Sequence, residues 1–463
     1  MKTPGKDRFV LFLRRSWFWM VTALLACTAI LQMILLFGEP FILNDDKEPA
    51  YSSQEGLNTA LYPEAIYVTL GGMENGSFVK VVPEDDCFSV LQEDMYALLK
   101  RVVAEGEMGN LQPLEVMDSR RLCAVLKLPF PADEQTLGGT LWEEVEGYPS
   151  MNYSTVAVYP SLRRGEPVRL LFLEKGEGQV REISAGSRDW EENLSLYRDL
   201  LDIGSGIMEG STRYVDAGLS FGNLFEPGTF VSDTEVSSEW DKMSISSAFF
   251  QRGDVRYSLL RSYINSFFEY PDAANRLTEE DALVYTSEKV TLKVTGDGYM
   301  HYMETLTDAE KTDTTLNEAY RTALTFLQGD LDRVGSLYQG LKLVRILRQQ
   351  QGFTFWFDYT LMGRDLELSQ MPEGMEDMEH PVSITVVGSS VRECRRWVLK
   401  EELKGQTHSF NNTWKTVMDL AATRVDISDI AEPPREVYYY NGHALIIAWQ
   451  VRMKDGSALY LAD

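Results

Sequence analysis

The chain has 463 residues and carries 70 acidic against 44 basic side chains, which gives a formal net charge of −26. Such a negative field repels nucleic acids and anionic lipid headgroups, so the composition argues against a DNA or RNA partner. Four cysteines are too few for a disulfide-stapled miniprotein, and the length is that of a protein with two or three domains and real hydrophobic cores.

An uncharged apolar stretch lies near the N-terminus, at residues 16–37. As a helix rising 1.5 Å per residue it would span about 33 Å, enough to cross a hydrocarbon core about 30 Å thick. The preceding tail, residues 1–15, carries five basic residues and one acid, so the positive-inside rule places the N-terminus in the cytoplasm. A cleaved signal peptide is the alternative, but its apolar core would be shorter and would end in small residues. We therefore predict a retained single-pass transmembrane helix in the cytoplasmic membrane, with the C-terminal domain outside.

One side of this predicted membrane helix carries small and polar side chains. Thr22, Ala26 and Ala29 fall on one face, and Gln32 lies near its edge. Small residues let helices approach closely in lipid, and a glutamine can donate a hydrogen bond across the contact. The pattern predicts a partner-binding face for a second transmembrane helix.

Residues 38–62 are rich in proline, asparagine, aspartate and serine, which favours a stalk with little to bury. From residue 63 onwards the patterns are those of a folded domain. The alternation of apolar and polar residues predicts strands at 66–70, 78–82, 122–128, 155–159, 168–173 and 180–183, and helices at 88–103 and 189–201. A glycine-rich stretch follows to about residue 228. We predict a first mixed ectodomain unit at 63–250.

The second half of the chain, 251–463, is more regular. Helical periodicity predicts helices at 255–268, 316–327, 334–349 and 414–422. Strands are expected at 283–286, 290–294, 299–303, 353–359, 365–368, 382–387, 437–440, 444–451 and 458–461, while 392–403 fits a strand or a helix. Because tight turns and not helical crossovers join the strands, the sequence predicts an α+β fold of repeated helix-plus-antiparallel-meander units.

One catalytic motif occurs in the chain. Residues 218–222 match the G-x-S-x-G nucleophile elbow around Ser220, which needs a preceding strand, a following helix and later Asp and His partners. The next residues end in Glu226-Pro227-Gly228 and cannot begin a long helix. We therefore interpret the match as a coincidence and predict that Ser220 is not a nucleophile.

The sequence offers equally little support for a metal or cofactor site. None of His301, His380, His408 and His443 has a second His or Cys at metal-ligand spacing. The glycines at 204–206 lack the spacing of a phosphate-binding loop. The sequence predicts no enzyme, no metal and no cofactor, and it leaves open a disulfide between Cys87 and Cys123.

The stretch 267–302, C-terminal to the basic tail, the predicted anchor and the stalk, carries a more specific pattern. An apolar helix leads to an Asn-Arg pair, an acidic group, a Val-Tyr-Thr strand and an Asp-Gly turn before a tyrosine-containing strand. The matching positions are Asn275, Arg276, Glu279–Asp281, Val284–Thr286, Asp297, Gly298 and Tyr302. In these features the chain resembles the YycH/YycI family, the membrane-anchored extracytoplasmic regulators of the essential WalK–WalR two-component system of Gram-positive bacteria.

The resemblance implies a non-enzymatic accessory protein. Its partners would be a sensor histidine kinase and a YycI-like regulator, contacted through the transmembrane helices and the ectodomains. The family-motif positions are Asn275, Arg276, Tyr285, Asp297, Gly298 and Tyr302. Two alternatives stay open, an envelope ligand- or peptide-binding module and an envelope hydrolase, and the sequence does not say whether the kinase is restrained or supported.

Overall fold

The computed structural model describes residues 64–462 except for a set of short gaps. The gaps are 71–77, 83–84, 114–120, 133–152, 164–165, 175–178, 187–189, 208–212, 218–224, 226–227, 233–237, 252–253, 256, 269–270, 272–273, 279–281, 308–312, 329–339, 363 and 411–412. The expected membrane helix, its face of Thr22, Ala26, Ala29 and Gln32, the stalk and Ser220 lie outside the described residues. Among the helices that are described, none is long and apolar enough to cross a membrane.

The first large sheet is built from residues 65–232. Its nine strands are β1 Ala65–Leu70, β2 Phe78–Val81, β3 Glu107–Pro113, β4 Leu122–Ala132, β5 Tyr153–Tyr159, β6 Val168–Glu174, β7 Gln179–Ala185, β8 Arg213–Asp216 and β9 Phe230–Ser232. Their order is β3-β7-β6-β5-β4-β1-β2-β8-β9, and every described pairing is antiparallel.

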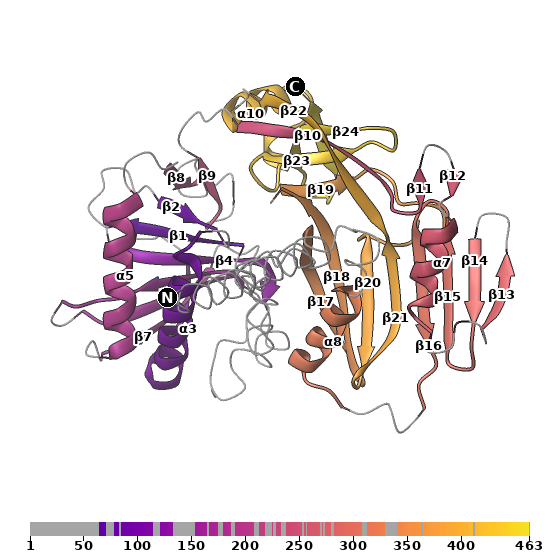
Figure 1. The fold of residues 1–463 in the computed structure, drawn as a ribbon. Helices are drawn as coiled ribbons and strands as arrows, with labels where there is room; N and C mark the ends of the chain where they lie inside the picture. The colour runs from indigo at the N-terminus through magenta and orange to yellow at the C-terminus, as the bar shows by residue number, and fades with distance from the viewer. Residues whose placement is uncertain are drawn as a thin grey trace, which may run out of the picture. The chain divides into compact units, whose positions relative to one another are not determined.

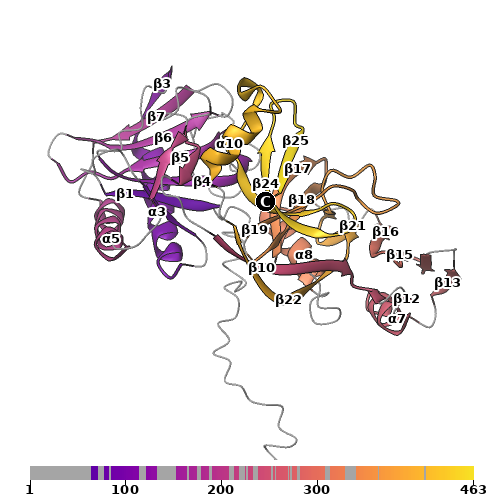
Figure 2. The ribbon, with the colours of Figure 1, turned by 90° about the horizontal axis from the view of Figure 1, so that it is seen from above.

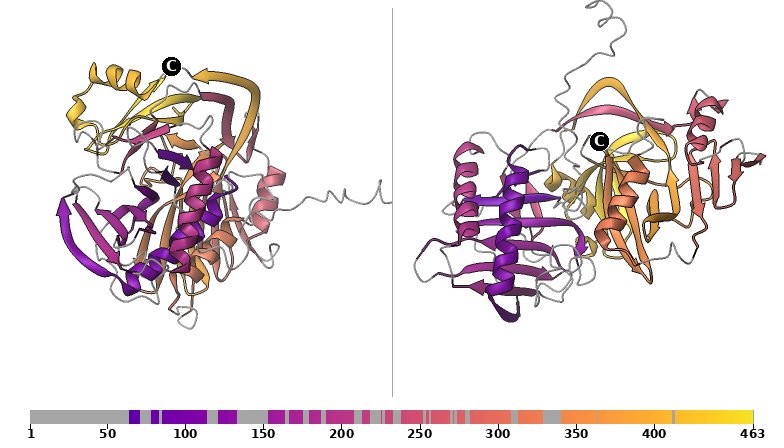
Figure 3. Two further views of the ribbon diagram at one scale, coloured as in Figure 1. Left: turned by 90° about the vertical axis from the view of Figure 1, so that its left-hand side faces the viewer. Right: turned by 60° about the horizontal axis from the view of Figure 1, so that its bottom comes forward.

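Two helices cover one face of this sheet, α3 Phe88–Glu105 and α5 Glu191–Ile207 (Figure 3). In α3 the buried apolar residues recur every three or four positions, as at Leu91, Met95 and Val102, so one stripe of the helix faces the core. The two helices also pack on each other. Asp94 of α3 accepts a hydrogen bond from Ser195 of α5, with 2.8 Å between the oxygens.

The second large sheet contains most of the later strands. They are β13 Asn275–Thr278, β14 Ala282–Thr286, β15 Val290–Thr295, β16 Tyr299–Glu304, β17 Leu341–Gln349, β18 Gly352–Leu361, β19 Arg364–Leu368, β20 Val382–Val387, β21 Ser390–Trp397, β23 Arg435–Tyr440, β24 Leu445–Arg452 and β25 Ala458–Ala462. Their order is β13-β14-β15-β16-β21-β20-β18-β19-β23-β24-β25, with β17 paired to β18 beside this path (Figure 1). The pair β19–β23 is parallel.

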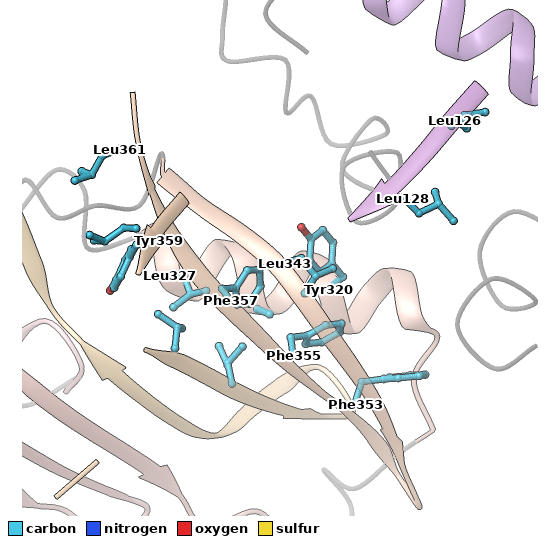
Figure 4. Close-up of a cluster of buried hydrophobic side chains, with 14 of the residues drawn as sticks. Leu126, Leu128, Tyr320, Leu327, Leu343, Phe353, Phe355, Phe357, Tyr359 and Leu361 are labelled. Carbon is cyan, nitrogen blue, oxygen red and sulfur yellow. The ribbon is translucent and has the colours of Figure 1, made fainter. Parts of the chain in front are cut away.

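Helices α7 Tyr257–Asn265 and α8 Leu316–Gln328 cover the same face of this second sheet. The ring of Phe267, just after α7, lies 5.8 Å from that of Tyr302 on β16 and 5.6 Å from that of Phe326 on α8. Figure 4 shows Tyr320 of α8 beside the phenylalanines of β18, and the ring centroids of Tyr320 and Phe355 are 5.5 Å apart. Packed aromatic rings of this kind make up much of the core on the helical face.

A two-stranded ribbon forms a third sheet, whose described strands pair with neither large sheet. It pairs β10 Ser238–Ser247 with β22 Leu399–Phe410 (Figure 2). Helix α10 Trp414–Ala422 and the short 3₁₀ helix Ile427–Asp429 follow β22. A small hairpin, β11 Phe250–Gln251 with β12 Asp254–Val255, comes after β10.

The coarse fold prediction is confirmed for the described residues, which form an α+β structure of helices and largely antiparallel sheets. The prediction of a helix at 334–349 is wrong, because 341–349 is strand β17. The spacing of its apolar residues fits both a helical and a strand period, and pairing with β18 stabilises the strand. The region 392–403 is strand in β21 and β22, and α5 continues through the glycines at 204–206.

Two further predictions concern the boundary between the two ectodomain units and the state of the cysteines. The boundary at residue 250 stays a prediction, and β10, which precedes it, pairs with β22, which follows it. Cys87 and Cys123 are thiols, so the bridge that the sequence left open is not formed in this structure.

Candidate protein-interaction face

The second sheet has a face turned away from α7 and α8, which we call the open face. Successive side chains of a strand point to opposite sides, so Met300 and Tyr302 of β16 face the helices while His301 and Met303 point the other way. The strand registers then place on the open face Arg345, Leu347, Trp356, Thr385, Glu393, Arg395, His301, Met303 and Lys293. This face mixes charged, hydroxyl, aromatic and apolar side chains.

Charged groups of the open face are arranged in pairs, one between strands β16 and β21 and one between β21 and the segment before β20. His301 Nε2 lies 3.0 Å from Glu393 Oε1, and the hydrogen bond from His301 lowers the pKa of the Glu393 carboxyl. Arg395 donates two hydrogen bonds to the carboxylate of Asp377, at 2.8 and 2.6 Å. This bidentate pair lowers the pKa of Asp377 and raises that of Arg395. The pairs keep the face charged but locally balanced.

An acidic segment between β19 and β20, residues 370–381, lies over one end of the open face; we call it the acidic loop. Besides Asp377, two of its residues reach sheet side chains. Glu379 lies 3.6 Å from Arg345 of β17, and His380 Nδ1 lies 2.7 Å from Asp358 Oδ1 of β18. Met375 of the loop is buried in the core. The open face therefore already holds one acidic stretch of chain by contacts to its arginines.

Two apolar side chains of the open face are accessible. Met303 on β16 is 42% exposed and Leu347 on β17 is 44% exposed. Methionine and arginine are enriched at protein–protein interfaces, where a few apolar side chains sit among polar ones. This composition makes the open face the candidate surface for a protein contact.

The family-motif positions occupy three places in this half of the structure. Asn275 and Arg276 lie on β13, the outermost strand at one end of the sheet, and Arg276 stands opposite Tyr285. The Arg276 guanidinium lies 5.9 Å from the Tyr285 ring centroid. Tyr302 is buried on the helical face, where it donates to Glu304 at 3.0 Å and burial raises the pKa of its phenol.

Asp297 and Gly298 form the turn between β15 and β16. Gly298 has φ +100°, and Val398 N donates to its carbonyl oxygen at 2.8 Å. The Trp397 indole N–H donates to the Asp297 carbonyl oxygen at 2.9 Å. The turn is thereby fixed to the junction of β21 and β22, which is a structural role.

The residues weighed for catalysis or metal binding are dispersed. His301 and His380 pair with carboxylates on the open face, and His443 is exposed beside the turn after β23. Over the described part of the chain, His, Cys, Asp and Glu do not gather in groups of three or more that could hold a metal ion.

The sequence did not reveal the open face or the role of Arg345. Arg345 and Leu347 were assigned to the expected helix at 334–349, and the face arises only when the strands of the second sheet are paired. The apolar–basic alternation of β17 from Leu341 to Leu343 was the one local signal of a strand. The acidic composition of 370–381 was visible but did not show what that segment touches.

Comparison with known proteins returns no matching family model and no matching curated protein. Among solved structures the chain is similar to YycH from Bacillus subtilis, with 11% identity and a TM-score of 0.48 over 87% of this chain and 96% of that one. It is also similar to the YpeB C-terminal domain of Bacillus megaterium, with 14% identity and a TM-score of 0.24 over 45% of this chain and 96% of that one.

Proposed function

We propose that the protein is a membrane-anchored extracytoplasmic regulator that acts by protein–protein contact and modulates a sensor histidine kinase together with a YycI-like partner. The observation that carries the proposal is the open face of the second sheet, with Met303, Leu347 and Arg345 accessible on it. The role needs no chemistry on a substrate.

The sequence supplies the location in this proposal. The uncharged stretch 16–37 and its basic flank support a single anchor with the acidic remainder of the chain outside. On that anchor Thr22, Ala26, Ala29 and Gln32 would form a lateral contact with a kinase transmembrane helix. The open face and the anchor would then act as two contacts with one partner complex.

Site-specific photo-crosslinking tests the proposal with the full chain in its native membrane. A benzoylphenylalanine in place of Met303 probes the open face, and one in place of Leu420 on α10, 47% exposed, is the matched control. We expect mass spectrometry to identify a sensor histidine kinase or its partner regulator crosslinked at position 303 and not at 420. Equal products at both positions, or adducts at 303 with unrelated proteins alone, would contradict the proposal.

A second candidate function is an envelope peptide-binding module. The acidic loop supports it, because Asp377 and Glu379 show how a stretch of chain can be seated on Arg395 and Arg345. Crosslinking at position 303 to envelope peptides in place of a kinase would favour this candidate.

A further inference from the structure

Strand β17 is an edge strand. It pairs with β18 in antiparallel register from Leu341↔Tyr359 to Gln349↔Gly352. Within the described residues β18 is its one hydrogen-bonded strand partner, and β4 of the first sheet also lies against it without pairing. An edge strand presents a row of backbone N–H and C=O groups that can pair with another chain. From Arg345 to Gln349 every side chain but the half-buried Ile346 is exposed.

The charge of β17 differs in sign from that of the whole chain. Between Leu341 and Gln349 it carries three basic residues and no acid, in a chain of net charge −26. Lys342 is already engaged, with its ammonium 3.2 Å from Asp365 and 3.4 Å from Glu64. Arg345 and Arg348 are thus the cations that the exposed part of the strand offers.

Both arginines are held in place by aromatic rings of β18. The Arg345 guanidinium lies 4.9 Å from the Trp356 ring centroid, and that of Arg348 lies 5.9 Å from the Phe353 centroid. A guanidinium over an aromatic ring keeps its charge and its hydrogen-bond donors. The strand therefore presents two positioned cations, one on each side of the sheet, with exposed Leu347 between them.

The chain's own acidic loop indicates the chemistry that suits these cations. Glu379 reaches Arg345 at 3.6 Å, and both side chains are more than half exposed, at 78% and 54%. An exposed ion pair contributes little to stability, so a second carboxylate can take this position at little cost. Charge complementarity points to an acidic occupant.

We propose that Arg345–Gln349 of β17 binds an extended acidic segment of a partner protein, which adds to the second sheet as a further strand. Carboxylates of the segment pair with Arg345 and Arg348, and an apolar side chain of the segment packs on Leu347. This mode gives affinity through main-chain hydrogen bonds and specificity through alternate side chains. The inference deepens the proposed regulatory function, on which it rests, by naming the strand and the chemistry of the partner.

The test uses the full chain in nanodiscs of zwitterionic lipid and a fluorescein-labelled nine-residue peptide built around Glu-Val-Val-Glu. In either strand direction this segment places carboxylates opposite Arg345 and Arg348 and a valine opposite Leu347. Fluorescence anisotropy should show saturable binding to the wild type and binding at least about tenfold weaker to the Arg345→Glu/Arg348→Glu double variant. The control is Arg392→Glu/Arg424→Glu, which makes the same charge change at two other exposed arginines and should stay within about twofold of wild type. No binding to the wild type, or equal weakening in both double variants, would overturn the inference.

Backbone methylation of the peptide separates strand addition from simple charge attraction. Two peptides with N-methyl groups on alternate amides block one or the other edge of the extended peptide, and only one edge can face β17. We expect one of them to bind at least about tenfold more weakly than the other. Equal affinity of the two methylated peptides would contradict strand addition. Peptide binding that salt abolishes but methylation leaves unchanged would contradict it as well.

The two proposals fail in different ways. If Arg345→Glu/Arg348→Glu abolishes peptide binding while crosslinking at position 303 returns no kinase, the β17 site stands and the regulatory role fails. If the same variant leaves peptide binding and kinase crosslinking unchanged, the β17 site fails and the regulatory role stands.

Discussion

The guanidinium group of Arg364 lies 4.0 Å from the ring centroid of Trp240. Trp240 belongs to β10 and is fully buried, and Tyr438 of β23 packs edge-on against it at 4.7 Å. Tyr438 also donates a hydrogen bond to the Asp241 carbonyl oxygen at 2.8 Å. These contacts join the β10–β22 ribbon to strands β19 and β23, so the tryptophan fixes the ribbon on the second sheet.

Truncation of this tryptophan should therefore be costly. We expect Trp240→Ala to lower the free energy of unfolding by about 3–5 kcal/mol, because it leaves a cavity and removes the ring under Arg364. Trp240→Phe should cost clearly less, since it keeps an aromatic ring. Chemical denaturation followed by circular dichroism measures both. Lys415→Met, next to the half-buried Trp414, is the control for an exposed cation–ring pair and should cost almost nothing.

The Asp297–Gly298 turn gives a second prediction. A Cβ at Gly298 would lie 2.8 Å from the Val398 carbonyl oxygen and 2.9 Å from Ser247 Oγ, in a backbone with positive φ. We expect Gly298→Ala to destabilise by about 2–3 kcal/mol through steric overlap added to the backbone strain. Gly456→Ala is the matched control, because its φ is +87° but no atom lies within 4 Å of the added Cβ. Equal thermal midpoints for the two variants would show that the turn is not packed as described.

The seam between α3 and α5 carries a carboxyl pair that should make stability depend on pH. Burial and the hydrogen-bonded carboxyl of Asp94 raise the pKa of Asp199 to about 6. A raised carboxyl pKa means that the native state keeps a proton that the unfolded state has lost, so stability falls as pH rises from about 4 to 6. Asp199→Asn should thus be more stable than wild type at pH 7, by about 1 kcal/mol after allowance for solvent screening, and close to it at pH 4.

The measurement is a series of denaturation curves between pH 4 and pH 7.5. Asp419→Asn, at an exposed position of α10, serves as the control and should leave the pH profile of the wild type unchanged. A constant difference between Asp199→Asn and wild type across the series would contradict the pH assignment.

The ionic cluster around Asp365 gives the opposite dependence on pH. Burial alone would raise the pKa of Asp365, but the charges of Lys342 and Arg435 lower it below its ordinary value. A lowered carboxyl pKa contributes stability that is present above about pH 4 and is lost as the pH falls further. We expect Asp365→Asn to cost about 2–3 kcal/mol at pH 7, because Lys342 and Arg435 each lose one of their two carboxylate partners, and less at pH 3. Denaturation at the two pH values measures the difference.

Local sequence patterns predicted the helices and strands that bury one face against the core. Strand 382–387 and helix 414–422 were predicted with the bounds that the structure has. Both combine a clear period with adjacent turn or capping residues, such as Thr413, whose side chain accepts from Thr416 N. Strand β10 was not predicted, because its partner β22 lies far away in the sequence. Strand β17 was not predicted, because its apolar residues also fit a helical period.

The residues of the candidate site were likewise predictable only where a local pattern reveals them. The tyrosine, aspartate and glycine of the stretch 267–302 were recognised as a pattern, and the structure gives each a packing or turn role. The open face needed the registers of six strands before its residues became neighbours. No local rule can supply such a face, because contacts across a sheet are set by tertiary pairing.

Pairing of β10 with β22 also has a consequence for biogenesis. Its register runs from Ser247↔Leu399 to Ser238↔Phe410, so β10 is synthesised long before the strand that completes it. Chains fold from the N-terminus as they emerge, and contacts between distant residues form late. Until β22 arrives, β10 presents Trp240 and an unpaired backbone to its surroundings. The newly made chain therefore passes through an interval in which β10 is an unpaired edge prone to aggregation, and pairing with β22 ends that interval.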